Sequence, residues 1–174
     1  GAGNYESALY LNNCSPIIEK TEVSNSSHYG ILCNNSHAII KSCDIHDNWS
    51  YPIYAVNVIC PNLYGNSYTG NVIEGIAIAG GNLTTNGTWH YDAGEPYMVL
   101  GDVAVCSNST LTIDPGTTIK FASDAGLKIG LDWHSSGELY AVGKPDSLIT
   151  FTSLGDTTNG WDGLYFTDAS DRDG

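Results

Sequence analysis

A repeat of 22 residues near the N-terminus limits what this chain can fold into. The segment LNNCSPIIEKTEVSNSSHYGI, which starts at Leu11, aligns with CNNSHAIIKSCDIHDNWSYPI, which starts at Cys33. A third, weaker copy runs from Ala55 through Tyr64 to Gly75. The matched pairs include Asn12 with Asn34, Ile17 with Ile39, Ile18 with Ile40, Val23 with Ile45, Tyr29 with Tyr51, and Ile31 with Ile53.

A repeat of this length cannot bury its apolar face alone, so it must stack on neighbouring repeats. Residues 9–11, 31–33 and 53–55 alternate with a period of two and are bounded by Asn, Ser, Gly and Pro. These properties indicate short strands. We expect each repeat to form one coil, with further strands around Ile17 and Val23, and to pair in parallel with the coil before it.

The second half has the same texture without the 22-residue register. Turn residues such as Asp114-Pro115-Gly116 and Lys144-Pro145-Asp146 separate its short alternating runs. We expect residues 81–174 to form a second β-helical segment after residues 1–80. The predicted strands cover residues 103–105, 111–113, 119–121, 127–129, 139–142, 149–151 and 164–166.

The NNxxxxII and HYGI/SYPI patterns of the first 79 residues resemble the repeats of the pectate-lyase-like superfamily. The stretch GNLTTNGTWHYDAGEPYMVLGDVAVCSNSTLTIDPGTTIKF looks like the opening coils of β-helix modules in large bacterial and archaeal surface proteins. The resemblance implies an all-β fold, a right-handed parallel β-helix, with closing coils of one module in residues 1–80 and opening coils of another in 81–174. It implies little about function, because the superfamily includes lyases, hydrolases, adhesins and structural proteins.

Composition disfavours several partners. The chain has 6 Lys and Arg against 19 Asp and Glu, a net charge of −13, which disfavours nucleic acid and anionic membranes. No apolar stretch approaches the roughly 18 residues of a membrane span, so we expect no membrane insertion in this segment. The N-terminus lacks the features of a signal peptide, so a signal or anchor of an exported protein would have been removed or would lie outside this segment.

Catalysis is disfavoured. Proton abstraction beside a uronate carboxylate calls for a basic side chain and cations, yet Arg172 is the chain's one arginine. The Gly-His-Gly and Arg-x-Lys strings of the polygalacturonate hydrolases are absent. The remaining catalytic candidates are Asp44, His46 and Asp47, in which a carboxylate beside an imidazole can relay protons. The repeat register favours a solvated turn there instead.

The five cysteines show no CxxC motif and no metal-ligand spacing with histidine, which disfavours zinc and redox chemistry. Alternation points Cys33 and Cys43 inward, so we predict mostly free, buried thiols. A disulfide between neighbouring coils stays open as an alternative. The cysteines are Cys14, Cys33, Cys43, Cys60 and Cys106.

Seven asparagines begin Asn-x-Ser/Thr sequons, where about three are expected by chance. This excess fits an exported glycoprotein, because glycans occupy surface turns. It fits equally well a fold whose turns favour Asn and Ser. The sequon asparagines are Asn13, Asn25, Asn34, Asn48, Asn82, Asn86 and Asn108.

Two further patterns point to ligands. Asp168, Asp171 and Asp173 in TDASDRDG faintly resemble a calcium-binding loop, with an acidic solvent-exposed loop as the alternative. Aromatic rings beside turns can stack on sugars, with packing as the commoner role. The tryptophans are Trp49, Trp89, Trp133 and Trp161.

Together these features predict a secreted or cell-surface β-helix with a structural or adhesive role. Neither end reads as a capped coil, so we expect either neighbouring modules of a longer chain or head-to-tail stacking of copies into a fibre, sheath or array. No cofactor is expected, apart from the calcium candidate. The alternative is a polysaccharide-binding or polysaccharide-processing β-helix, either a lyase or a hydrolase.

Overall fold

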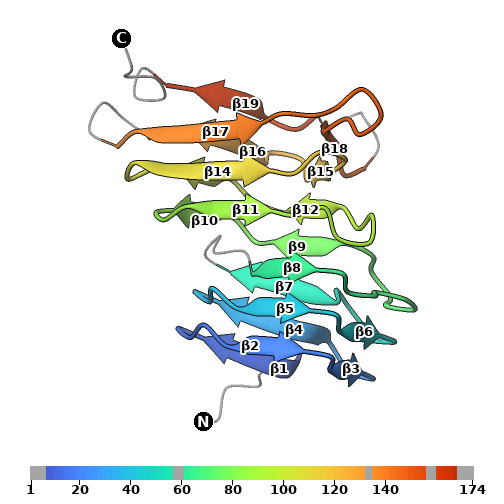
Figure 1. Ribbon diagram of the computed structural model, residues 1–174. Helices are drawn as coiled ribbons and strands as arrows, with labels where there is room; N and C mark the ends of the chain where they lie inside the picture. Colours follow the sequence, from blue (N-terminus) through green and yellow to red (C-terminus); the bar gives the residue numbers. More distant parts are fainter. Residues whose placement is uncertain (1–6, 57–60, 132–134, 156–159, 168–174) are drawn as a thin grey trace.

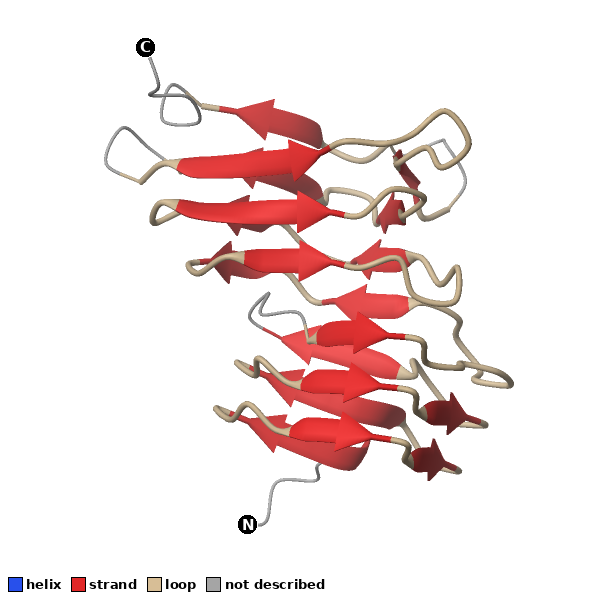
Figure 2. Ribbon diagram, viewed as in Figure 1, coloured by secondary structure: helices blue, strands red, loops and turns tan. Residues whose placement is uncertain are grey.

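The computed structural model describes residues 7–56, 61–131, 135–155 and 160–167. Within these ranges every regular element is a strand, and the strands lie one above another in coils that rise from the N-terminal to the C-terminal end (Figures 1 and 2). All pairs between these strands are parallel. The predicted all-β parallel β-helix is therefore confirmed.

One sheet runs along the whole described stack. Its strands are β1 (Ser7–Asn12), β4 (Tyr29–Asn34), β7 (Ile53–Val56), β9 (Ile76–Ile78), β12 (Tyr97–Val99), β15 (Thr118–Phe121) and β18 (Thr150–Ser153). We call it the long sheet. Each coil contributes one strand to it, so the long sheet records the order of the coils.

The other faces change partway along the stack. In the N-terminal coils they consist of β2 (Ile17–Glu19), β5 (Ile39–Lys41) and β8 (Asn62–Tyr64), and of β3 (Glu22–Ser24) with β6 (Asp44–His46). In the C-terminal coils they consist of β10 (Gly81–Leu83), β13 (Val103–Val105), β16 (Gly126–Ile129) and β19 (Gly163–Phe166), and of β11 (Gly87–Trp89), β14 (Ser109–Ile113) and β17 (Gly137–Ala141). The change falls near residue 80.

The pairing register in the first coils is the one that the repeat predicts. Ile17 pairs with Ile39, Val23 with Ile45, and Ile31 with Ile53. Later coils are longer, since Thr150 pairs with Thr118, 32 residues earlier, across the loop that follows β17. This lengthening explains why the second half has strand-like texture without a 22-residue period.

A single apolar core fills the stack. Its buried side chains run from Val23 to Ile129 and include Ile40, Ile78 and Trp89, so the core continues past residue 80. Stacked isoleucines and leucines bury apolar area in every coil, which is the main stabilising contribution in such a repeat. The division into two modules at residue 80 stays a prediction, since the side faces change there while the core and the long sheet continue.

Turn residues recur at equivalent places in successive coils. Asn13 and Asn35 both have positive φ, at 50° and 49°, and so do Asn25 and Asp47, at 57° and 52°. Asparagine and aspartate tolerate this left-handed region better than most residues because their short side chains bond locally. The turns therefore select asparagine for a backbone reason.

Candidate functional site

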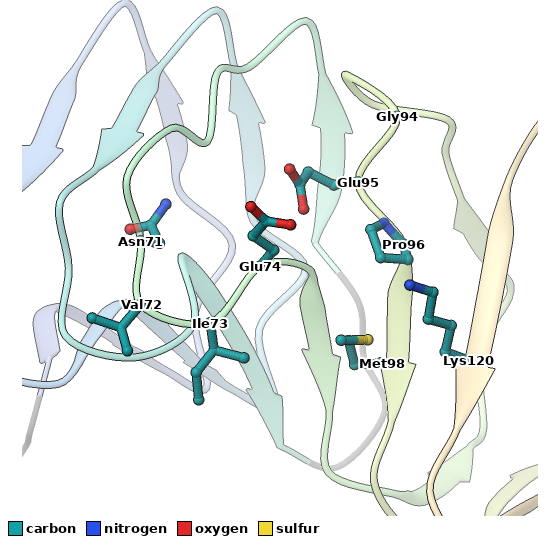
Figure 3. A pocket seen from close by; sticks show the side chains of 9 residues that line it. All are labelled: Asn71, Val72, Ile73, Glu74, Gly94, Glu95, Pro96, Met98 and Lys120. Atoms are coloured by element: carbon teal, nitrogen blue, oxygen red, sulfur yellow. The ribbon is translucent and has the colours of Figure 1, made fainter. Parts of the chain in front are cut away.

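A groove of about 430 Å³ lies beside the long sheet, between the loop that leads into β9 and the loop that leads into β12 (Figure 3). Its open side faces solvent. The lining residues are Asn71, Val72, Ile73, Glu74, Gly94, Glu95, Pro96, Met98 and Lys120. The groove thus combines an apolar wall with two carboxylates and one ammonium group.

The loop that carries Val72, Ile73 and Glu74 is fixed by a buried pair of asparagines. The Asn71 amide Nδ2 donates to the Ile45 carbonyl at 2.8 Å, and Asn71 Oδ1 accepts from the Asn48 backbone N–H at 3.1 Å and from Asn48 Nδ2 at 2.9 Å. Asn48 repeats the arrangement one coil below, where its Oδ1 accepts from the Ser26 N–H at 3.0 Å and its Nδ2 donates to the Val23 carbonyl at 3.2 Å. Both side chains thereby satisfy turn backbone groups that water cannot reach.

A second buried pair fixes the opposite loop. Asp92, which is 2% exposed, accepts from the Asn66 backbone N–H at 3.1 Å, from Asn66 Nδ2 at 2.7 Å and from the Tyr68 hydroxyl at 2.7 Å. Burial, together with the Asp92 carboxylate, raises the pKa of Tyr68 well above its usual value, so the phenol stays a donor. The Asp92 carbonyl then accepts from the Glu95 N–H at 3.0 Å, which fixes Glu95 at the groove.

Met98 and Lys120 project from adjacent strands of the long sheet, β12 and β15, where they are register partners. Gly75, with φ of 105°, lies against them: a Cβ there would meet Met98 Cγ at 2.7 Å and the Pro96 carbonyl at 3.0 Å. The absence of a side chain at Gly75 therefore lets the two loops approach closely. This approach narrows the groove at its sheet side.

The Glu95 carboxylate has an unusual environment. Burial raises its pKa, a backbone hydrogen bond from Gly75 lowers it, the nearby Glu74 carboxylate raises it, and Lys120 lowers it, with the net shift upward. Its Oε2 atom is buried and has no hydrogen-bond partner. A carboxylate oxygen in this state gains a large stabilisation from any donor that reaches it.

The sequence-predicted residues Asp44, His46 and Asp47 lie together at the end of β6. His46 Nδ1 is 2.8 Å from Asp47 Oδ2, and Nε2 is 3.9 Å from Asp44 Oδ2. The coil below adds Glu22, whose Oε1 is 3.3 Å from Nε2, a partner that sequence reasoning did not include. The Asp47 hydrogen bond, with the other carboxylates, raises the pKa of His46. Carboxylates thus hold the imidazolium form, which makes His46 a weak general base.

His46 is expected to make stability depend on pH. Its pKa in the folded chain lies above the usual 6.5, so the stabilisation is fully present below about pH 6.5 and is lost as pH rises through the folded-state value. The melting temperature of the wild type minus that of His46→Gln should fall between about pH 5 and about pH 9. A difference that stays constant or grows as pH rises would contradict the assignment.

The remaining predicted site residues are dispersed. Asn13, Asn25, Asn82, Asn86 and Asn108 are exposed and Asn34 is half-buried, whereas Asn48 is buried in the ladder described above. That position disfavours glycan attachment at Asn48 once the coils have folded. Asn13, Asn25 and Asn108 have positive φ, which supports turn geometry as one cause of the sequon excess. The calcium candidates Asp168, Asp171 and Asp173, and Arg172, lie outside the described residues.

The cysteines and tryptophans divide in the same way. Cys33, Cys43 and Cys106 are buried free thiols, as predicted, while Cys14 is free and exposed. Burial raises the pKa of the Cys33 thiol to about 12, so it stays protonated and unreactive. Trp49 is exposed, Trp89 is in the core and Trp161 packs against Phe121 with ring centroids 4.5 Å apart. Cys60 and Trp133 lie outside the described residues.

Metal clusters and membrane-spanning helices are both absent from the described part of the chain. No group of three or more His, Cys, Asp or Glu side chains that could hold a metal ion occurs among the described residues. Those residues also form no helix of the length and apolarity that a bilayer crossing requires. The groove and the His46 cluster are therefore the two arrangements of polar side chains that we consider further.

Comparison with known proteins agrees with the geometry. Residues 2–130 match the model of the right handed beta helix region, and the chain belongs to this family. The chain is also 44% identical over 65 residues to Protein bark beetle of Drosophila melanogaster. That match covers 37% of this chain and 2% of the fly protein. No solved structure matches.

Proposed function

We propose that this chain is a structural or adhesive β-helix segment of a secreted or cell-surface protein. The observation that carries the proposal is the continuous apolar core beneath one long sheet, which makes the segment a stiff spacer rather than a scaffold for a deep active site. Each coil contacts chiefly its neighbours, so such a stack extends by adding coils without changing those already present. The acidic net charge of −13 is typical of a soluble outer surface.

The end coils support the assembly part of the proposal. The inward positions Leu9, Leu11 and Ile18 at one end are partly buried, although their register partners in the next coil, Ile31, Cys33 and Ile40, are fully buried. At the other end Phe166 is 55% exposed, while its partner Ile129 is fully buried. Another coil, from the same polypeptide or from a second copy, would cover these apolar side chains and satisfy the open strand edges. A contact of this kind between copies does not close and so builds a fibre.

Location is tested with an antibody against this segment, applied to intact and to permeabilised cells of the source. Labelling of intact cells, or of the material around them, is expected. Labelling that needs permeabilisation would contradict a secreted or cell-surface position. Antibody against an abundant cytosolic protein provides the control, since its signal must be absent from the intact cells.

Glycans provide a second test. Protein from its native source is expected to weigh more than the 18.5 kDa of the chain or, within a larger polypeptide, to yield peptides with sugar on the exposed sequons. Mass spectrometry after deglycosylation should mark Asn13, Asn82 and Asn86 but leave Asn48 unmodified, because its amide is buried. Native peptides without sugar at every sequon would leave turn geometry as the whole cause of the sequon excess.

One observation favours the polysaccharide alternative. Glu74 and Glu95 share a groove, and burial raises the pKa of Glu95, which is the pattern of a general acid beside an ionised carboxylate in glycoside hydrolysis. Incubation with acidic and neutral polysaccharides, followed by assays for reducing ends and unsaturated uronates, tests it. Turnover that Glu95→Gln abolishes would establish the groove as the site, whereas turnover that Asp44→Ala or His46→Ala abolishes would favour the cluster at β6.

A further inference from the structure

The groove contains a buried acceptor without a donor. Glu95 Oε2 is shielded from water and makes no hydrogen bond, while a hydrogen bond from the Gly75 backbone supports the ionised form of the same carboxylate. An ionised oxygen that is shielded from water is costly unless a positively charged donor pairs with it. The nearby ammonium of Lys120 lowers the pKa of Glu95 through its charge, yet it makes no hydrogen bond to Oε2.

The wall beside this acceptor is apolar and accessible. Val72 is 70% exposed and Ile73 is 37% exposed, both unusual for branched aliphatic side chains in a chain with a well-filled core. Figure 3 shows both residues on one side of the groove, Met98 and Lys120 on the other, and the Glu74 and Glu95 carboxylates between these two sides. A ligand that fits must therefore have an aliphatic part and a group that donates hydrogen bonds.

Charge selects the sign of that group. The groove contains two carboxylates against one ammonium, and the whole chain has a net charge of −13, so a cation is attracted and an anion is repelled. Lysine and arginine side chains have an aliphatic stem that packs on apolar surface and a charged head that donates hydrogen bonds. The groove lining contains no aromatic ring on which a sugar would stack.

We propose that this groove binds a lysine or arginine side chain of a partner protein, with the charged head on Glu95 and Glu74 and the stem along Val72 and Ile73. This site is independent of the structural role proposed above, because it requires the two loops and not the ends of the stack. Glu95 acts as the principal acceptor, and Glu74 adds attraction at the mouth.

The test uses the 174-residue protein and a capped Gly-Gly-Lys-Gly-Gly peptide. Titration is followed by the ¹H–¹⁵N signal of Gly75, whose backbone bonds to Glu95. We expect a saturable shift with a millimolar dissociation constant, which weakens as salt rises. Matched peptides with norleucine or acetyl-lysine in place of lysine keep the stem and remove the charge, and should bind at least tenfold more weakly.

Variants distinguish this site from general attraction. Glu95→Gln should weaken binding about tenfold, Glu74→Gln should weaken it less, and Lys120→Gln should tighten it severalfold, because a like charge is removed. Glu22→Gln changes the net charge equally outside the groove and should leave affinity unchanged. Circular dichroism spectra that match the wild type show that each variant is folded.

Four outcomes overturn the proposal. They are equal binding of the norleucine peptide, equal weakening by Glu22→Gln and Glu95→Gln, an absence of any Gly75 shift at about 20 mM peptide, where a millimolar site is saturated, and a Gly75 shift with a neutral cello-oligosaccharide but not with the lysine peptide. The last result would assign the groove to sugar. None of these outcomes depends on whether the coils assemble into a longer stack.

Discussion

Ile40→Asp is expected to lower the free energy of unfolding by about 3–5 kcal/mol, the largest effect of any single change considered for this chain. Ile40 has no exposed surface and lies between Ile18 and Leu63, its register partners in the coils below and above. An aspartate there places a carboxylate in the apolar core with no donor to pair with it. Chemical denaturation followed by circular dichroism measures the change.

The matched control is Ile17→Asp, on the neighbouring strand β2. Ile17 is 66% exposed, so the same substitution leaves its carboxylate in water and should cost less than about 1 kcal/mol. Similar losses for the two variants would show that Ile40 does not face the core. That result would remove the stacked arrangement of β2, β5 and β8.

Asn48→Leu is expected to lower the free energy of unfolding by about 2–4 kcal/mol although it adds apolar surface to a buried site. The substitution leaves the Ser26 N–H without its acceptor and the Val23 carbonyl without its donor. It also removes one of the donors to Asn71, which fixes the loop at the groove. Denaturation curves and the Gly75 amide signal report the two effects separately.

Asn82→Leu is the control for that variant. Asn82 also begins a sequon but is exposed on β10, so its loss should change stability by no more than about 0.5 kcal/mol. Equal stability of Asn48→Leu and the wild type would mean that the buried asparagine pair does not hold the turns. The fixed position of the loop before β9 would then need another cause.

The fold of the first coils could be predicted because one register repeats. Each 22-residue step returns the same side-chain type to the same face, so the matches of Ile17 with Ile39 and of their neighbours are enough to define the pairing. The shortest strands of the middle coils, such as β11 and β12, carry no comparable signal. They have three residues each, and the loops between them vary in length, so no period marks them.

The polar architecture was harder to predict. Asn48 carries a sequon, which drew attention to glycosylation, whereas its structural role depends on Asn71 in the next coil. The spacing of 23 residues between these asparagines is the signal that could have revealed the pair. Glu74, Glu95 and Lys120 meet only because three successive coils stack, and no local motif connects them. The carboxylates around His46 were found in part, because Asp44 and Asp47 are close in sequence and Glu22 is not.

The most direct test of the account is electron microscopy of the native protein at a resolution that separates coils, with the mass of its polypeptide measured beside it. The account predicts that β-helical density continues beyond β1 and beyond β19 at a coil spacing of about 4.8 Å, through further coils of the same polypeptide or through a second copy. The mass distinguishes these two sources. Discrete particles in which other structure closes both end coils would contradict the proposed role as part of an extended stack.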